Sequence, residues 1–233
     1  MATRTLIGDP DVTVTLKRSN RAKRMSLRVS RLDGRVTLTV PKFASDRDAM
    51  GFLVEKESWI RGHLETRAPL KQVTHGAHMP FLGREVEIVA GASGRSPRLE
   101  GERLMVPGDA AKAGPRVSAF LKTQARSRLA EASDRYADAL GVKATAITLR
   151  DTRSRWGSCT SEGRLMYSWR LVMAPEVVLD YVAAHEVAHL LEMNHSARYW
   201  AHVKRVCPDY VLHRAWLRRH GETLHAWRFE SLD

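Results

Sequence analysis

The sequence has few of the features that mark secreted, membrane-spanning or disordered proteins. Only two of its 233 residues are cysteines, Cys159 and Cys207, and they form no CxxC pair, so no disulfide framework is expected. No apolar run approaches the roughly 18 residues that span a bilayer. The first residues, MATRTLIGDPD, lack the apolar core of a secretory signal. We therefore expect a cytoplasmic protein with no membrane partner.

The composition is that of a folded protein with an excess of positive charge. At 43% hydrophobic and 27% charged residues, the chain can form a core, and its net charge is +12. From Lys17 to Arg35 there are eight basic residues and one acid, Asp33. This basic N-terminal patch fits nucleic-acid phosphates, but a solvated strand face has the same composition. Both interpretations stay open, and no motif of a known nucleic-acid-binding module is present.

Residues 1–110 are predicted to form a β-rich region with one helix. Hydrophobic alternation or flanking turns predict strands at 12–16, 25–30, 35–40, 81–89 and 103–106. Asp33-Gly34 predicts a hairpin turn, and Pro41 should end the strand at 35–40. An amphipathic helix should follow, running to about residue 67 and capped by Ser45.

The loop at 107–115, PGDAAKAGP, is the predicted boundary to a second region, residues 111–233. This region should contain a long helix over 116–140 that ends at Gly141, a strand within 144–151 and an irregular segment over 152–169. From Pro175 onward three helical pieces are expected. The whole chain is predicted to be an α+β protein, with a helical catalytic region after the β-rich one.

The segment HEVAHLLEMNH, residues 185–195, carries the chemistry. His185 and His189 are four residues apart, so on a helix their imidazoles lie side by side and can bind one metal ion. Glu186 adjoins the first histidine and can act as a general base on a water at that ion. HExxH is the zincin signature. Apolar neighbours such as Val182 and Val187 indicate a buried helix rather than one with two surface histidines.

His195 is the first choice for a third ligand. It lies six positions after His189, so the chain must turn, and Asn194 in a left-handed conformation could end the helix. Ser196 could then cap the next helix. Three histidines with one open position are the layout of a catalytic zinc site. The competing third ligands are His202, Asp209 and Glu222.

Four motifs resemble those of the YgjP-like metallopeptidases, relatives of the SprT-like zinc metalloproteases. They are WGSC (156–159), YVxxHExxH (181–189), NHSxxYW (194–200) and CPDY (207–210). Tyr199 stands where phenylalanine is common in that family. The resemblance also covers RSNRAKRMSLRV and VPKFAS near the N-terminus and is weakest between about residues 69 and 114. It implies a minimal zincin domain that binds zinc through His185, His189 and His195, with Glu186 as general base.

The resemblance also implies that the WGSC loop lies near the active-site cleft. Within and beside it, Arg153, Arg155 and Trp156 are candidates for substrate binding, since the arginines could hold an anionic group or an oxyanion. Core packing for the tryptophan and a basic surface for the arginines are the alternatives. Cys159 has no neighbour in the sequence that would activate it as a nucleophile.

The preferred function is that of a zinc-dependent metallopeptidase acting on proteins or peptides. A metal-dependent hydrolase of nucleotides or other phosphorus-containing anions is the second hypothesis, because the chain is basic. The third is a non-catalytic, zinc-stabilised DNA-binding module, in which Glu186 would have no role. Nucleic acid could also be a partner of a peptidase, through the basic N-terminal patch.

Overall fold

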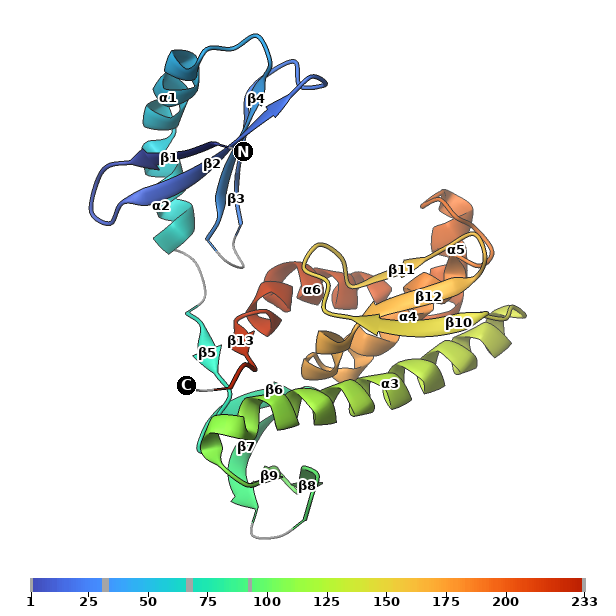
Figure 1. The fold of residues 1–233 in the computed structure, drawn as a ribbon. Coiled ribbons are helices and arrows are strands. Elements are labelled where there is room, and N and C mark those ends of the chain that lie inside the picture. The colour runs from blue at the N-terminus through green and yellow to red at the C-terminus, as the bar shows by residue number, and fades with distance from the viewer. Residues whose placement is uncertain (1, 31–33, 66–68, 92–93, 232–233) are drawn as a thin grey trace. The chain divides into compact units, whose positions relative to one another are not determined.

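The computed structural model describes residues 2–30, 34–65, 69–91 and 94–231, and within them the chain is an α+β protein, as expected (Figure 1). It divides into two compact units, Met1–Pro69 and Leu70–Asp233. The boundary expected near residue 110 therefore lies inside the second unit. The reason is that the strands between residues 78 and 107 share one hydrophobic core with the helices that follow them.

The first unit is a four-stranded sheet with two helices. Its strands are β1 (Ala2–Leu6), β2 (Val12–Ser19), β3 (Ser26–Val29) and β4 (Val36–Pro41), in the order β1-β2-β4-β3. The central strands β2 and β4 are parallel, and each outer strand is antiparallel to its neighbour. Alternate side chains of the sheet form a core with the helices. Its fully buried members include Val14, Val36, Leu38, Leu53 and Ile60. The first three strands expected from the sequence are present, and β1 is an additional one.

The helical segment expected after Pro41 is two helices, α1 (Asp46–Glu55) and α2 (Glu57–Glu65), which meet at Lys56. Ser45 caps α1 as expected. Its hydroxyl accepts the backbone N–H of Asp48, and the Asp48 carboxylate accepts the backbone N–H of Ser45. Of the hairpin turn expected at Asp33-Gly34, Asp33 lies outside the described residues.

The second unit begins with a sheet of the same strand order as the first. β6 (His78–Phe81), β7 (Arg84–Gly91), β8 (Arg98–Glu100) and β9 (Arg103–Pro107) follow the order β6-β7-β9-β8, again with a parallel central pair. The single strand expected at 81–89 is divided between β6 and β7 by a turn, in which Leu82 and Gly83 have φ angles of 49° and 81°. β5 (Lys71–Gln72) pairs with β13 (Trp227–Arg228), far along the chain.

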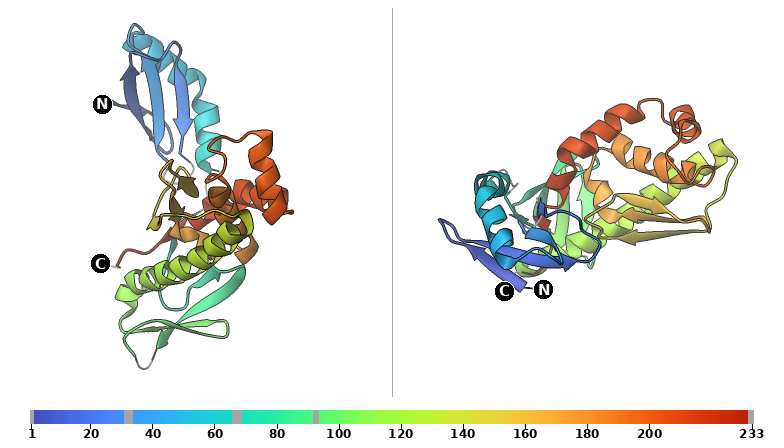
Figure 2. Two further views of the ribbon diagram at one scale, coloured as in Figure 1. Left: turned by 90° about the vertical axis from the view of Figure 1, so that its right-hand side faces the viewer. Right: turned by 90° about the horizontal axis from the view of Figure 1, so that it is seen from above.

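Helix α3 (Ala113–Leu140) runs through the middle of this unit. It lies between the β6–β9 sheet and helix α4 (Glu176–Ala188), as Figure 1 and the left view of Figure 2 show. The short 3-10 helix η1 (Ala110–Lys112) precedes α3, so most of the loop expected at 107–115 is helical. α3 ends at Gly141, with φ 70°, as expected. Its buried residues recur at helical spacing and include Val117, Leu121, Ala125, Leu129 and Ala132.

A three-stranded sheet in the order β10-β12-β11 carries the WGSC motif. Its strands are β10 (Ala146–Arg150), β11 (Gly157–Cys159) and β12 (Arg164–Ser168). The segment 152–169 was expected to be irregular, but it forms β11 and β12, which pair antiparallel with Gly157 opposite Tyr167. The remaining elements are η2 (Trp169–Met173), α4, α5 (Ala197–Val206) and α6 (Tyr210–Leu224), so the three expected helical pieces are present. Among the described residues no helix is long and apolar enough to cross a bilayer.

Candidate metal centre

Helix α4 and the residue that follows it supply two histidines, and the glutamate next to the first of them lies on the helix. Nine of its thirteen residues are buried, in agreement with the apolar neighbours seen in the sequence. His185 and Glu186 lie in its last turn, and His189 directly follows its last residue and keeps helical angles of φ −66° and ψ −18°. His185 and His189 therefore remain one turn apart on the same helix face.

The chain then turns and brings His195 back toward α4. The left-handed conformation expected for Asn194 is not found, because Leu82 is the only non-glycine residue with a positive φ in the described part of the chain. Backbone hydrogen bonds to the last turn of α4 close the turn instead. The side-chain oxygen of Asn194 accepts the backbone N–H of Ser196 at 3.0 Å, and Ser196 caps α5 as expected.

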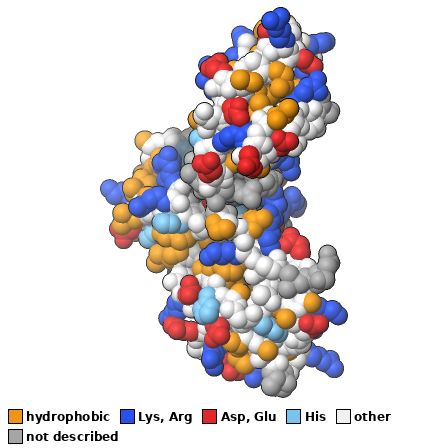
Figure 3. Space-filling model, turned by 90° about the vertical axis from the view of Figure 1, so that its left-hand side faces the viewer, with side chains coloured by type: hydrophobic (Ala, Val, Ile, Leu, Met, Phe, Trp, Pro, Cys, Tyr) orange, Lys and Arg blue, Asp and Glu red, His pale blue; other side chains and the backbone are white. Residues whose placement is uncertain are grey.

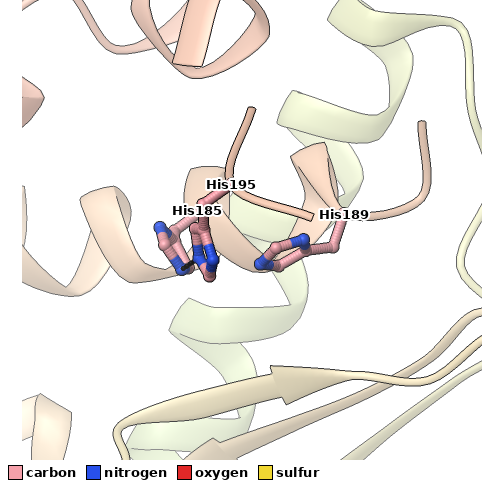
Figure 4. A group of neighbouring side chains, drawn as sticks. All are labelled: His185, His189 and His195. Carbon is pink, nitrogen blue, oxygen red and sulfur yellow. Dashed lines mark hydrogen bonds between the residues drawn. The ribbon is translucent and has the colours of Figure 1, made fainter. Parts of the chain in front are cut away.

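The three imidazoles converge, as Figure 4 shows. One nitrogen from each of His185, His189 and His195 lies within 4.8 Å of the other two. The Nε2 atoms of His185 and His195 are 3.2 Å apart. Two ligands of a tetrahedral zinc ion with metal–nitrogen bonds of about 2.05 Å are about 3.3 Å apart, so this spacing fits. The competing candidates from the sequence, His202, Asp209 and Glu222, are not part of this cluster.

The surroundings of His185 and His189 favour the neutral form of these two imidazoles, which is the form that binds metals. Burial, followed by the charges of His189 and His195, lowers the pKa of His185 to about 3. Burial also lowers the pKa of His189. A neutral imidazole has a free lone pair for a metal, whereas a protonated one does not. His189 donates from Nδ1 to the backbone carbonyl of Glu192 at 2.9 Å, which leaves its Nε2 with the lone pair.

Tyr199, on α5, holds the histidines in place and was not recognised in the sequence as part of the site. Its side chain is fully buried, and its ring stacks on His189 at a centroid distance of 4.4 Å and meets His195 edge-on at 4.8 Å. Its hydroxyl donates to the backbone carbonyl of His185 at 2.9 Å. A phenylalanine here would stack but could not make this bond. The sequence feature that could have indicated this role is the position of Tyr199 in the first turn of the helix capped by Ser196, close to His195.

Glu186 lies beside the histidines and is only 4% exposed. Burial raises the pKa of its carboxyl group to about 8, and the positive charge of Arg155 opposes this rise. Strand β11 passes close by. A Cβ added to Gly157 would lie 2.6 Å from the Cγ of Glu186, so only a glycine leaves room for the carboxylate at this point. This requirement was also not recognised from the sequence.

Two pockets adjoin the cluster and share His185, Glu186, Arg155 and Gly157. The first has a volume of about 480 Å³ and contains all three histidines. Its other lining residues are Ser154, Ser158, Cys159 and Met193. The second has a volume of about 360 Å³ and extends toward α6. Its other lining residues are Trp156, Tyr181, Val182, Arg214, Leu217 and Arg218.

Only two of the three candidate substrate-binding residues therefore lie at the pockets. Arg155 and Trp156 line the pockets, whereas Arg153 does not and acts electrostatically on Asp151 and His225. Cys159 lines the first pocket, but burial and then the charge of Glu186 raise its pKa to about 11. The thiol therefore stays protonated at neutral pH and is a poor nucleophile.

A larger hollow, of about 850 Å³, lies at α3 and the start of α4 and contains none of the three histidines. Four of its charged residues form two ion pairs, Arg128 with Glu176 and Arg135 with Asp180. The smaller pockets at the histidines are therefore the better candidates for a substrate cleft.

Comparison with known proteins places this site in a family. The family model described as "YgjP-like, metallopeptidase domain" matches residues 23–220, which include every residue of the histidine cluster. Among solved structures, a match is the metallopeptidase zymogen of Pyrococcus abyssi abylysin, with 19% identity and a TM-score of 0.36. That match covers 40% of this chain and 93% of the other. No curated protein matches significantly. Because the family model spans most of the sequence, the chain belongs to the YgjP-like metallopeptidase family and is a metal-dependent hydrolase.

Proposed function

We propose that the protein is a zinc-dependent peptidase in which His185, His189 and His195 bind the metal and Glu186 is the general base. The observation that carries the proposal is the convergence of three imidazoles beside a buried carboxylate, at the wall shared by two pockets. Three nitrogen ligands at this spacing favour zinc over magnesium or calcium, which prefer oxygen ligands.

Each residue has a defined task in peptide hydrolysis. When bound, a divalent ion supplies Lewis acidity that polarises the scissile carbonyl and makes water a stronger acid. Glu186 takes a proton from the attacking water and delivers it to the leaving amine. Tyr199 and the carbonyl of Glu192 fix the orientation of the imidazoles through the contacts described above. Gly157 keeps the backbone of β11 clear of the carboxylate.

The proposal is tested on protein stripped of metal with a chelator and then reloaded with zinc. We expect elemental analysis of the reloaded protein to find about one zinc per chain. The reloaded protein should hydrolyse peptides but not nucleotides, and the stripped protein should hydrolyse neither. A protein that hydrolyses nucleotides and leaves every peptide intact would support the second hypothesis from the sequence instead.

The ligand set is tested with a matched pair of histidines. His195→Ala should lose most of the zinc, because two imidazoles remain where a stable site needs three protein ligands. His202→Ala removes the same side chain from the same segment but from outside the cluster, and should keep full occupancy. If instead His195→Ala retains zinc and His202→Ala loses it, the third ligand is His202.

A further inference from the structure

The pocket that extends toward α6 is strongly cationic. Three exposed arginines line it, Arg155 from the loop before β11 and Arg214 and Arg218 from α6. In the described part of the chain none of the three forms a salt bridge, and the only acid among the lining residues is Glu186, which is needed at the metal. Three guanidinium groups around one hollow repel one another, so an anion that enters it is attracted.

The two arginines of α6 are positioned by specific contacts. Arg214 and Arg218 are four residues apart and therefore on one face of the helix, with Leu217 between them. One turn further on, Gly221 lies against Trp156, since a Cβ added there would be 2.9 Å from the Cζ2 of the indole. This close contact fixes the distance between α6 and the WGSC loop, and so the width of the pocket.

Arg214 is in addition held toward the histidines. Its guanidinium lies over the ring of Trp200, 5.0 Å from the ring centroid. The same tryptophan ring lies 5.8 Å from that of His185 and 5.7 Å from that of His195. A positive charge is therefore placed one aromatic ring away from the candidate metal ligands. The pocket also has apolar lining residues, Trp156, Val182 and Leu217, which form its floor.

We propose that this pocket determines substrate specificity by binding a carboxylate of the peptide next to the scissile bond. Arg214 and Arg218 would hold the carboxylate through charge-assisted hydrogen bonds, and the apolar floor would contact the methylene groups that carry it. A volume of about 360 Å³ admits one side chain. The carboxylate belongs to an aspartate or glutamate side chain or to the C-terminus of the peptide. This inference rests on the proposed peptidase function.

The test uses zinc-loaded protein and a proteome-derived mixture of peptides, with cleavage sites mapped by mass spectrometry. We expect Asp and Glu to be enriched at one fixed position relative to the scissile bond. If the C-terminus is the source, cleavage instead occurs at a fixed distance from the chain end and is lost when the peptides are amidated. Both results support the proposal and distinguish the sources of the carboxylate.

Substitutions identify the residues responsible. In Arg214→Gln and Arg218→Gln, kcat/KM for a peptide with the preferred carboxylate should fall about tenfold each, the loss expected for a partly solvated charged hydrogen bond. The matched peptide with glutamine in place of glutamate should be affected little. Arg219→Gln removes the same charge from the same helix outside the pocket and serves as the control. Cleavage without acidic preference, or a preference that survives both pocket substitutions, would overturn the proposal.

A binding measurement separates this inference from the peptidase function on which it rests. Zinc-loaded Glu186→Gln protein is immobilised and exposed to the same peptide mixture, and the retained peptides are sequenced. Enrichment of acidic peptides that requires Arg214 and Arg218 supports the carboxylate pocket, even if the wild-type protein cleaves nothing and the peptidase proposal fails. Retention without such enrichment counts against the pocket, whatever the wild-type protein hydrolyses.

Discussion

At the scale of single residues, the position of Glu186 depends on the space that its neighbour Gly157 leaves free. Glu186 is buried, yet its carboxyl group must reach the space between the histidines and the pockets. The missing side chain of Gly157 provides that space. A carboxylate displaced by an ångström loses much of its effect on a proton transfer, because catalysis depends on the distance between the reacting atoms.

We therefore predict that Gly157→Ala lowers kcat by roughly 10²-fold, the loss expected for a displacement of about 1 Å. The three atoms nearest to the added methyl group all belong to Glu186, so we expect the zinc content to change little. Gly51→Ala adds the same methyl group to helix α1 with no atom within 4 Å and is the control. Steady-state kinetics and elemental analysis measure both effects. Wild-type turnover in Gly157→Ala would mean that Glu186 tolerates the shift.

Some of these residues could be predicted from the sequence and others could not. Residues four apart on a helix lie on the same face, so the sequence alone was sufficient to predict that His185 and His189 are neighbours. The approach of Gly157 to Glu186, and of Arg214 to His185, depends on the packing of segments about 30 residues apart. No pattern in a single sequence reports such a distance.

At the scale of secondary-structure elements, length and periodicity decided what could be predicted. The long helix ends at the clear stop signal Gly141, and it and the three C-terminal helices were expected. β11 has only three residues, and all are half-buried, so its sequence shows no alternation of buried and exposed side chains. The strand forms because it pairs with β12. The turn after α4 was predicted with a left-handed Asn194, but backbone hydrogen bonds close it without one.

The end of α6 contains a group that makes the second unit sensitive to acid. His225 follows α6 directly and is 9% exposed, with its ring 5.0 Å from that of Trp156. Burial, and then the positive charge of Arg170, lowers its pKa from 6.5 to about 4, while Asp151 acts in the opposite direction. The unfolded chain therefore binds a proton at a higher pH than the folded chain does, and stability is lost as the pH falls from 6.5 toward 4.

The predicted consequence is that the free energy of unfolding falls between pH 7 and 4.5, with a contribution from His225 of up to about 2–3 kcal/mol. In His225→Gln, which cannot titrate, the fall should be smaller by that amount. Urea unfolding at the two pH values measures it in both proteins. An equal fall in the variant would show that His225 is not the group responsible.

At the scale of the whole molecule, the excess of positive charge is not uniform. In the first unit, Lys17, Arg28 and Arg35 line a hollow of about 390 Å³ together with serine and threonine side chains of the same sheet face. Arg18, by contrast, is paired with Asp46. On the face of the molecule in Figure 3, basic and acidic side chains occur together on both units. The hollow is therefore the best-defined part of the basic N-terminal patch.

Nucleic-acid binding by this patch stays a prediction. Lys17→Glu combined with Arg28→Glu should weaken any binding of DNA or RNA, and the affinity of the unmodified protein should fall steeply with salt because counterions are released. Arg126→Glu combined with Lys143→Glu reverses two exposed charges of the second unit and is the control. Fluorescence anisotropy with labelled oligonucleotides measures the affinities. No binding at low salt would leave the patch as a solvated sheet face.

The most direct test of the proposed mechanism is the peptidase activity of Glu186→Gln, measured together with its zinc content. Glutamine keeps the size of the side chain but cannot accept the proton, and general-base assistance is worth roughly 10²–10⁴ in rate. We predict that peptide hydrolysis falls by at least that range, while zinc stays at about one ion per chain because all three histidines remain. Wild-type turnover in a zinc-loaded Glu186→Gln protein would contradict the assignment of Glu186 as the general base.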